Sequence, residues 1–246
     1  MRYILTTLIL TVCSLTIYGQ AKITASTIPF SGFYVNGNYL KTIQKTKSPR
    51  KAQEMSEDLS FVIIPDMTYK ETELVFNFHE GSPPLTIIKN KDNYEFWTFE
   101  NDKVTDFNAS IRVEENNKIK INGKTLVKVC DFYETDKFEE GIILKELLFK
   151  GKYISEKGNI VEFKRNGQIV GLGMLKYYSP ITDYYDTGMQ IDMVRLGQTQ
   201  DKTENFGFKF QGDTLFIYKV KCIDNSINGC VTVDYGELVY KLVRKK

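Results

Sequence analysis

The stretch from Phe206 to Cys222 reads FGFKFQGDTLFIYKVKC and decides the fold class of this chain. Aromatic residues stand at alternate positions on both sides of the turn signal Gly212-Asp213, and lysines fill positions between them. This period of two, with one apolar and one charged face, is typical of antiparallel strands that cover a core. The stretch therefore predicts a β-hairpin whose rings line an interior. The expected inward set is Phe206, Phe208, Phe210, Phe216 and Tyr218.

The same alternation recurs along the chain and predicts an all-β, antiparallel fold, either one barrel or two packed β halves. We expect about fourteen to sixteen short strands, separated by glycine-containing turns. The turn signals include Asn36-Gly37, Asn122-Gly123, Asn166-Gly167 and Asn228-Gly229. One short helix is expected at residues 49–58, because Ser48 can cap it and Pro49 suits the first helical position.

The chain divides into an N-terminal β half at residues 22–130, a connecting segment at 131–144 and a C-terminal β half at 145–246. Each half opens with the pattern F-x-G-x-Y, at Phe30 to Tyr34 and again at Phe149 to Tyr153. This similarity indicates an internal duplication, although strand starts in β proteins also resemble one another by chance.

The Gly-x-aromatic strand opening, followed by many short amphipathic strands, resembles the lipocalin-like (calycin-type) secreted β-barrel proteins of Bacteroidota-type bacteria. Tyr34 or Tyr153 stands where true lipocalins carry tryptophan, and the only tryptophan is Trp97. Thr182-Asp183-Tyr184 matches a lipocalin string by letter but not by spacing, so we treat that match as coincidence. The resemblance implies a barrel with an apolar interior that has room for a ligand. It implies no particular ligand.

The first twenty-one residues are typical of a secretory signal peptide. A basic start at Arg2 is followed by an uncharged apolar stretch, and Gly19-Gln20-Ala21 places small residues where a signal peptidase cuts. The apolar stretch is shorter than the roughly twenty residues that span a bilayer. Lipid attachment at Cys13 is the alternative, because Leu10 to Cys13 has the shape of a lipobox. We therefore expect a periplasmic or extracellular protein with no transmembrane segment after cleavage.

Charge and cysteine content agree with this expectation. Lys and Arg (33) nearly balance Asp and Glu (31), so no strong field exists to recruit nucleic acid or an acidic membrane surface. Cys222 and Cys230 flank a polar turn between two strand-like runs, which predicts a disulfide in an oxidising compartment. Cys130 is then left as a buried free thiol.

The sequence offers little for catalysis, and we expect a non-enzymatic protein without cofactor or metal. His79 is the only histidine, and it stands before a Gly-Ser-Pro-Pro turn as a surface residue would. Asp224 to Gly229 opens like a calcium loop, but Tyr235 replaces the bidentate glutamate, so a plain hairpin turn is favoured. Hydrolysis by a pair of carboxylates stays open, since such a pair can come from anywhere in the chain.

Besides hydrolysis by acidic residues, two functions remain open at this point. The first is binding of a small apolar or amphipathic ligand inside the barrel, lined by residues such as Phe208 and Phe216. The alternative is a structural or partner-binding envelope protein with a filled core and a Tyr-rich contact loop. The candidate residues in that loop are Tyr177, Tyr178, Asp183, Tyr184 and Tyr185.

Overall fold

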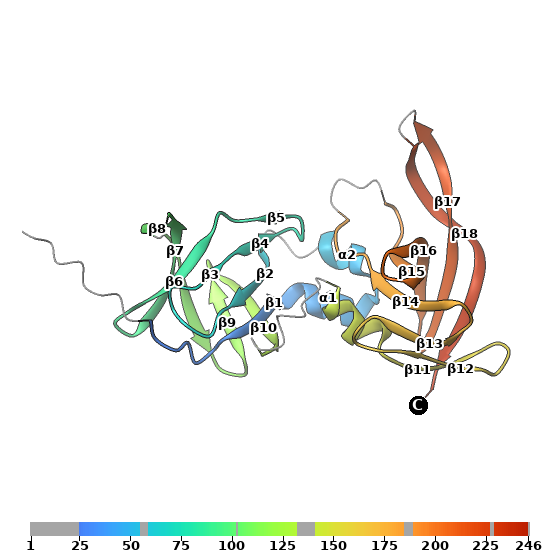
Figure 1. Cartoon of the computed structure of the whole chain (residues 1–246), viewed down its shortest axis with the longest axis horizontal. Helices are drawn as coiled ribbons and strands as arrows, with labels where there is room; N and C mark the ends of the chain where they lie inside the picture. The colour runs from blue at the N-terminus through green and yellow to red at the C-terminus, as the bar shows by residue number, and fades with distance from the viewer. Residues whose placement is uncertain are drawn as a thin grey trace, which may run out of the picture.

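The computed structural model describes residues 25–54, 59–101, 103–131, 141–184, 189–226 and 229–245. The expected signal peptide, including Cys13, lies outside the described residues, as does Tyr185. The structure is mostly antiparallel β, arranged as two sheets with a few short helices (Figure 1). The predicted fold class is therefore confirmed.

The first sheet has ten strands and is open, with the order β3-β6-β7-β8-β9-β10-β1-β2-β4-β5. It comprises β1 (Gly32–Asn36), β2 (Leu59–Ile64), β3 (Glu71–Thr72), β4 (Leu74–Phe76), β5 (Glu80–Gly81), β6 (Leu85–Asn90), β7 (Asn93–Glu100), β8 (Lys103–Glu114), β9 (Lys118–Ile121) and β10 (Lys124–Cys130). Both edge strands are only two residues long, which limits edge-to-edge pairing with other chains.

The second sheet is a closed barrel of eight strands in chain order. It comprises β11 (Gly151–Ser155), β12 (Ile160–Phe163), β13 (Gln168–Leu172), β14 (Leu175–Pro180), β15 (Met193–Thr199), β16 (Lys202–Gln211), β17 (Thr214–Ser226) and β18 (Gly229–Arg244). The barrel closes where β11 pairs with the end of β18, with Tyr153 opposite Arg244. Closure leaves no free edge within the barrel wall.

Helices lie between the two sheets (Figure 1). They are α1 (Gly37–Thr46), α2 (Pro49–Glu54), α3 (Ile142–Leu144) and the π-helical turn η2 (Lys145–Phe149). Helix α2 confirms the expected helix over residues 49–54, and residues 55–58 lie outside the described residues.

The prediction of a turn at Asn36-Gly37 is wrong, because helix α1 begins there. The Asn36 side-chain oxygen accepts hydrogen bonds from the backbone N–H groups of Asn38 (2.9 Å) and Tyr39 (3.3 Å). Asn is as favourable at a helix N-cap as it is in a turn, so the dipeptide alone does not separate the two. The expected turns at Asn122-Gly123 and Asn166-Gly167 are present between paired strands.

The two F-x-G-x-Y segments share their local geometry. The Tyr34 hydroxyl donates to the Phe30 carbonyl at 2.7 Å, and the Tyr153 hydroxyl donates to the Phe149 carbonyl at 2.8 Å. The glycines between them have φ values of +146° and +141°, which a side chain would strain. In each half, this segment leads into a strand that pairs with both the next strand and the last strand of its sheet.

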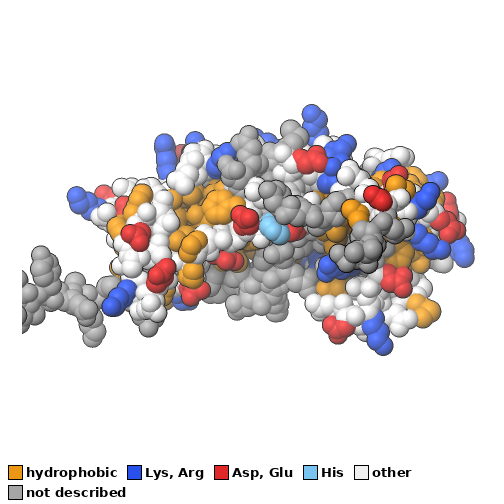
Figure 2. All heavy atoms as spheres, turned by 90° about the horizontal axis from the view of Figure 1, so that it is seen from above, with side chains coloured by type: hydrophobic (Ala, Val, Ile, Leu, Met, Phe, Trp, Pro, Cys, Tyr) orange, Lys and Arg blue, Asp and Glu red, His pale blue; other side chains and the backbone are white. Residues whose placement is uncertain are grey.

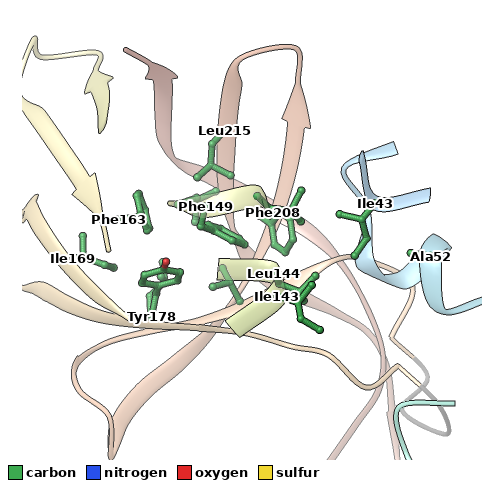
Figure 3. Close-up of a cluster of buried hydrophobic side chains, with 14 of the residues drawn as sticks. Ile43, Ala52, Ile143, Leu144, Phe149, Phe163, Ile169, Tyr178, Phe208 and Leu215 are labelled. Carbon is green, nitrogen blue, oxygen red and sulfur yellow. The ribbon is translucent and has the colours of Figure 1, made fainter. Parts of the chain in front are cut away.

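One hydrophobic core extends from the barrel to the helices and the first sheet. Phe149 and Phe208 from the barrel belong to the same buried cluster as Ile43 of α1, Ala52 of α2 and Phe33 of β1. Figure 3 shows Ile143 and Leu144 between the barrel rings and the two helices. The two sheets are therefore joined by apolar packing as well as by the chain. A second cluster fills the first sheet around Phe96.

The prediction of which β17 side chains point into the barrel is wrong. Leu215 and Ile217 are fully buried in the barrel, whereas Phe216 and Tyr218 are half-buried on the other face. Alternation alone cannot choose between two apolar faces, and the run Leu215 to Tyr218 is apolar at every position. The prediction for β16 holds, since Phe208 is fully buried.

The expected disulfide is present between Cys222 and Cys230, whose Cα atoms are 5.7 Å apart. Cys130 is buried and is not part of a disulfide, as predicted. In the part of the chain that the structure describes, no helix is both long and apolar enough to cross a bilayer.

Candidate functional site

The interior of the barrel, which was the first candidate for a binding site, is filled by packed aromatic rings. Phe149, at the end of η2, lies with its ring centroid 5.9 Å from Phe163, 5.5 Å from Tyr178, 5.0 Å from Phe208 and 5.8 Å from Phe210. Figure 3 shows its ring between those of Phe163 and Phe208. The segment before β11 thus inserts an aromatic side chain among the rings of the barrel wall.

Most of the side chains around Phe149 are fully buried, and Phe210 is half-buried. Tyr153, Tyr178, Leu215 and Ile217 are all fully buried. The Tyr178 hydroxyl donates to the Lys164 carbonyl at 2.8 Å, so this buried polar group is satisfied within the protein. Burial raises the pKa of the Tyr153 hydroxyl to about 12. These contacts are those of a packed core and not of a pre-formed ligand cavity.

The described part of the Tyr-rich stretch, Tyr177 to Tyr184, is buried or half-buried. Tyr178 is part of the core, and the ring of Tyr177 lies 5.7 Å from the ammonium group of the buried Lys145. The Tyr184 hydroxyl accepts a hydrogen bond from the backbone N–H of Met193 at 3.0 Å, and burial is the main cause that raises its pKa. The described tyrosines of this stretch are therefore used mainly for internal packing.

Asp183 lies instead at a polar junction between the two sheets. Its carboxylate is 2.7 Å from Nδ1 of His79, which follows β4 in the first sheet. Gln53 of α2 connects the same elements: its amide nitrogen donates to the Asn77 carbonyl at 2.5 Å, and its amide oxygen accepts from the Tyr184 N–H at 2.6 Å. Figure 2 shows the only histidine, in pale blue, at the surface between the two parts.

Among the described residues, the hydrogen bonds at this junction are those of a polar contact between the two sheets. His79 has Asp183 as an orienting partner, but the hydrogen bonds around the pair lead to the amide of Gln53 and to backbone groups. Acyl transfer would need a nucleophile within hydrogen-bond reach of the histidine. Among the described residues, no group of three or more His, Cys, Asp or Glu side chains could hold a metal ion. The calcium-like turn after Asp224 falls partly outside the described residues.

The sequence predicted a hairpin with a disulfide at Cys222 and Cys230, but not that the paired strands β17 and β18 extend beyond the rest of the barrel. The last pairing of β17 with β16 is Lys219 with Phe206, and β18 pairs with β11 only from Leu242 onward. Between these points the two strands pair with each other and project past the rest of the barrel (Figure 1). The Cys222–Cys230 disulfide links them in this projecting part. We call the projecting part, residues 220–226 and 229–241, the stapled hairpin.

Exposed apolar side chains lie on the stapled hairpin. Ile223 is 54% exposed, Val231 is 48% exposed and Leu238 is 43% exposed. Its base is held to the barrel by Tyr235, whose hydroxyl donates to the Phe208 carbonyl at 3.0 Å. The Tyr235 ring also contacts Tyr218 edge-on and lies 3.8 Å below the Lys209 ammonium. These contacts fix the base of the stapled hairpin to the barrel. The length of its two strand-like runs was the sign in the sequence that the hairpin could extend beyond the barrel.

The chain has no match among protein-family models, and neither the curated proteins nor the solved structures yielded one. The lipocalin-like resemblance thus stays a prediction.

Proposed function

We propose that this protein is a non-enzymatic, partner-binding protein of an oxidising compartment, either the periplasm or the extracellular space. The barrel serves as a rigid scaffold, and the stapled hairpin is the element that contacts the partner. The observation that carries the proposal is the packing of Phe149 against four aromatic rings inside the barrel wall. Because these rings occupy the interior around Phe149, we expect a partner to bind at the outer surface of the protein.

The stapled hairpin has three properties that favour binding of another protein. Its disulfide restricts the chain before binding, so less conformational entropy is lost when a complex forms. Ile223 and Val231 offer apolar surface that gains free energy on burial. Among the described residues, β17 has no ladder with β16 beyond Lys219, and β18 is bridged on its outer side at Val233 by Met189, so a stretch of outer edge is left that can accept an added strand from a partner. A disulfide also fits an oxidising compartment.

A small apolar ligand inside the barrel is the weaker proposal. Apolar ligands need a dry cavity of about 300 Å³ or more. The side chains that would line one, including Phe208, Tyr178 and Leu215, are fully buried against one another. Mass spectrometry of an organic extract from the purified protein tests this directly. We expect no lipid in stoichiometric amount, and one lipid per chain would favour the ligand-binding function.

Affinity capture from an extract of the producing cell's envelope tests the partner-binding function. Three baits are compared: the natural protein, the hairpin variant I223S/V231S, and the control M174S, which changes a 71% exposed side chain in the β13–β14 turn. Thermal unfolding first establishes that all three baits fold equally. We expect a protein retained by the natural bait and by M174S but lost from I223S/V231S. The same set of proteins on all three baits would refute a role for the hairpin.

A further inference from the structure

A pocket of about 320 Å³ lies where the α1–α2 connection meets the barrel. One wall is made by the chain around Ser48, another by Gln190 to Asp192 before β15, and a third by Lys209 to Gln211 of β16 with Tyr235 of β18. The volume is at the lower end of the range for small-molecule sites. It borders the packed barrel interior at Phe210, and its lining does not include the exposed Ile223 and Val231 of the stapled hairpin.

Positive charge gathers around this pocket. Its lining includes the cationic side chains of Lys47, Arg50, Lys51 and Lys209. Arg50 forms an ion pair with Glu54. Lys47 and Lys51 have no carboxylate within 4.0 Å among the residues that the structure describes, and Lys209 faces the ring of Tyr235. The lining therefore has an excess of positive charge, which concentrates an anion in the pocket.

The only carboxylate in the lining is Asp192, which is 9% exposed. It accepts a hydrogen bond from the Arg50 N–H at 2.9 Å and another from the Ser48 hydroxyl. Burial, partly offset by these bonds, raises its pKa above the ordinary value. A carboxylate has about four acceptor positions, so Asp192 has acceptor capacity left for a hydroxyl donor in the pocket.

We propose that this pocket binds a hydroxylated anion, namely a sugar that carries a carboxylate or phosphate group. Lys47, Lys51 and Lys209 hold the anionic group, since ammonium groups form the stronger, charge-assisted hydrogen bonds with such oxygens. Asp192 accepts a sugar hydroxyl at the inner wall. The amides of Gln190 and Gln211, which also line the pocket, supply further donors and acceptors for hydroxyls.

Two sources could supply this chemistry: a soluble acidic sugar or the headgroup of an anionic lipid. Backbone amide chemical shifts in the full chain distinguish them, followed at Lys51, Gln190 and Gln211. The soluble probes are glucuronate and glucose 6-phosphate, with glucose as the neutral control. The lipid probe is phosphatidylinositol in phosphatidylcholine vesicles, with pure phosphatidylcholine as its control, and is read by vesicle co-sedimentation.

We expect saturable shifts at the pocket with at least one anionic sugar, and affinity for glucose at least about tenfold lower, which equals about 1.4 kcal/mol. Binding to phosphatidylinositol vesicles without binding of either soluble sugar would support the headgroup source. Shifts of equal affinity for glucose and glucuronate, or binding to none of the anionic probes, would overturn the proposal.

A pair of charge-reversal variants locates the effect. The variant K51E/K209E should bind the anionic probe at least about tenfold more weakly, because attraction at two positions becomes repulsion. The control K176E/K202E makes the same change in net charge at two exposed lysines of β14 and β16 outside the pocket, and should bind normally. Equal weakening in both variants would show a general charge effect and overturn the site. The inference does not depend on the hairpin, since I223S/V231S should retain sugar binding.

Discussion

Replacing Phe149 by alanine tests the packing of the barrel most severely. The side chain is fully buried and contacts the rings of Phe163, Tyr178, Phe208 and Phe210, with centroid distances from 5.0 to 5.9 Å. Because the contacting rings come from three different strands, β12, β14 and β16, they cannot all move inward to fill the space. The substitution therefore leaves most of the removed volume as a cavity.

The expected loss of stability follows from the size of this cavity. A buried Phe→Ala change typically costs about 3–5 kcal/mol, and the larger values belong to sites that cannot collapse. Aromatic pairs add about 0.5–1.5 kcal/mol each beyond burial, although such pairs are not additive. We therefore expect F149A to lower the free energy of unfolding by about 4 kcal/mol.

Urea unfolding followed by far-ultraviolet circular dichroism provides the assay. Fluorescence of Trp97, the only tryptophan, reports the first sheet separately, because Trp97 lies in β7. The control is F107A, which removes a ring that is 51% exposed and should cost about 1 kcal/mol or less. A loss below about 1.5 kcal/mol for F149A would show that the site tolerates a void, and would refute the packed-core reasoning.

Three further predictions concern the hairpin, the buried tyrosines and the junction. The variant C222S/C230S should lose about 2–3 kcal/mol of local stability on the loop-entropy model, with faster amide exchange at residues 220–224 and an unchanged barrel; unchanged exchange would contradict this. Burial raises the pKa values of Tyr34 and Tyr153 to about 12, above the ordinary value of 10.0, so the unfolded chain releases these protons first. These two groups should therefore not change the free energy of unfolding below about pH 10, and should lower it between about pH 10 and 12. Phenolate absorbance of the folded protein should rise only at a higher pH than in the unfolded chain. A constant free energy of unfolding across that window would argue against the burial of these tyrosines. H79A should cost less than about 1 kcal/mol, because the His79 and Asp183 side chains are 40% and 30% exposed, and a loss above about 2 kcal/mol in urea would mean that the junction holds the sheets together.

Much of the fold could be predicted from the sequence because alternation along strands is a local property. The β16–β17 turn at Gly212-Asp213 and the buried position of Phe208 could both be predicted from the alternation between Phe206 and Cys222. The inward face of β17 did not, since Leu215 to Tyr218 is apolar on both faces and a neighbouring strand decides which face is buried. Helix α1 was missed because Asn36-Gly37 has the same composition in a turn and at an N-cap.

The candidate sites were harder to predict because they depend on contacts between distant parts of the chain. The pairing of His79 with Asp183 joins residues that are 104 positions apart in the sequence, and no local sequence pattern predicts it. The pocket near Asp192 joins three segments whose lysines look like ordinary surface residues in the sequence. Tyrosine content at Tyr177 to Tyr184 suggested a contact surface, but the same rings satisfy internal packing equally well.

Xenon under pressure tests most directly whether the described part of the barrel interior, around Phe149, has room for a ligand, because xenon enters dry apolar cavities. A crystal structure of the natural protein under xenon should show no xenon atom among Phe163, Tyr178 and Phe208, whereas F149A should hold xenon at the vacated position. Xenon inside the barrel of the natural protein would contradict the account and return the interior to consideration as a binding site.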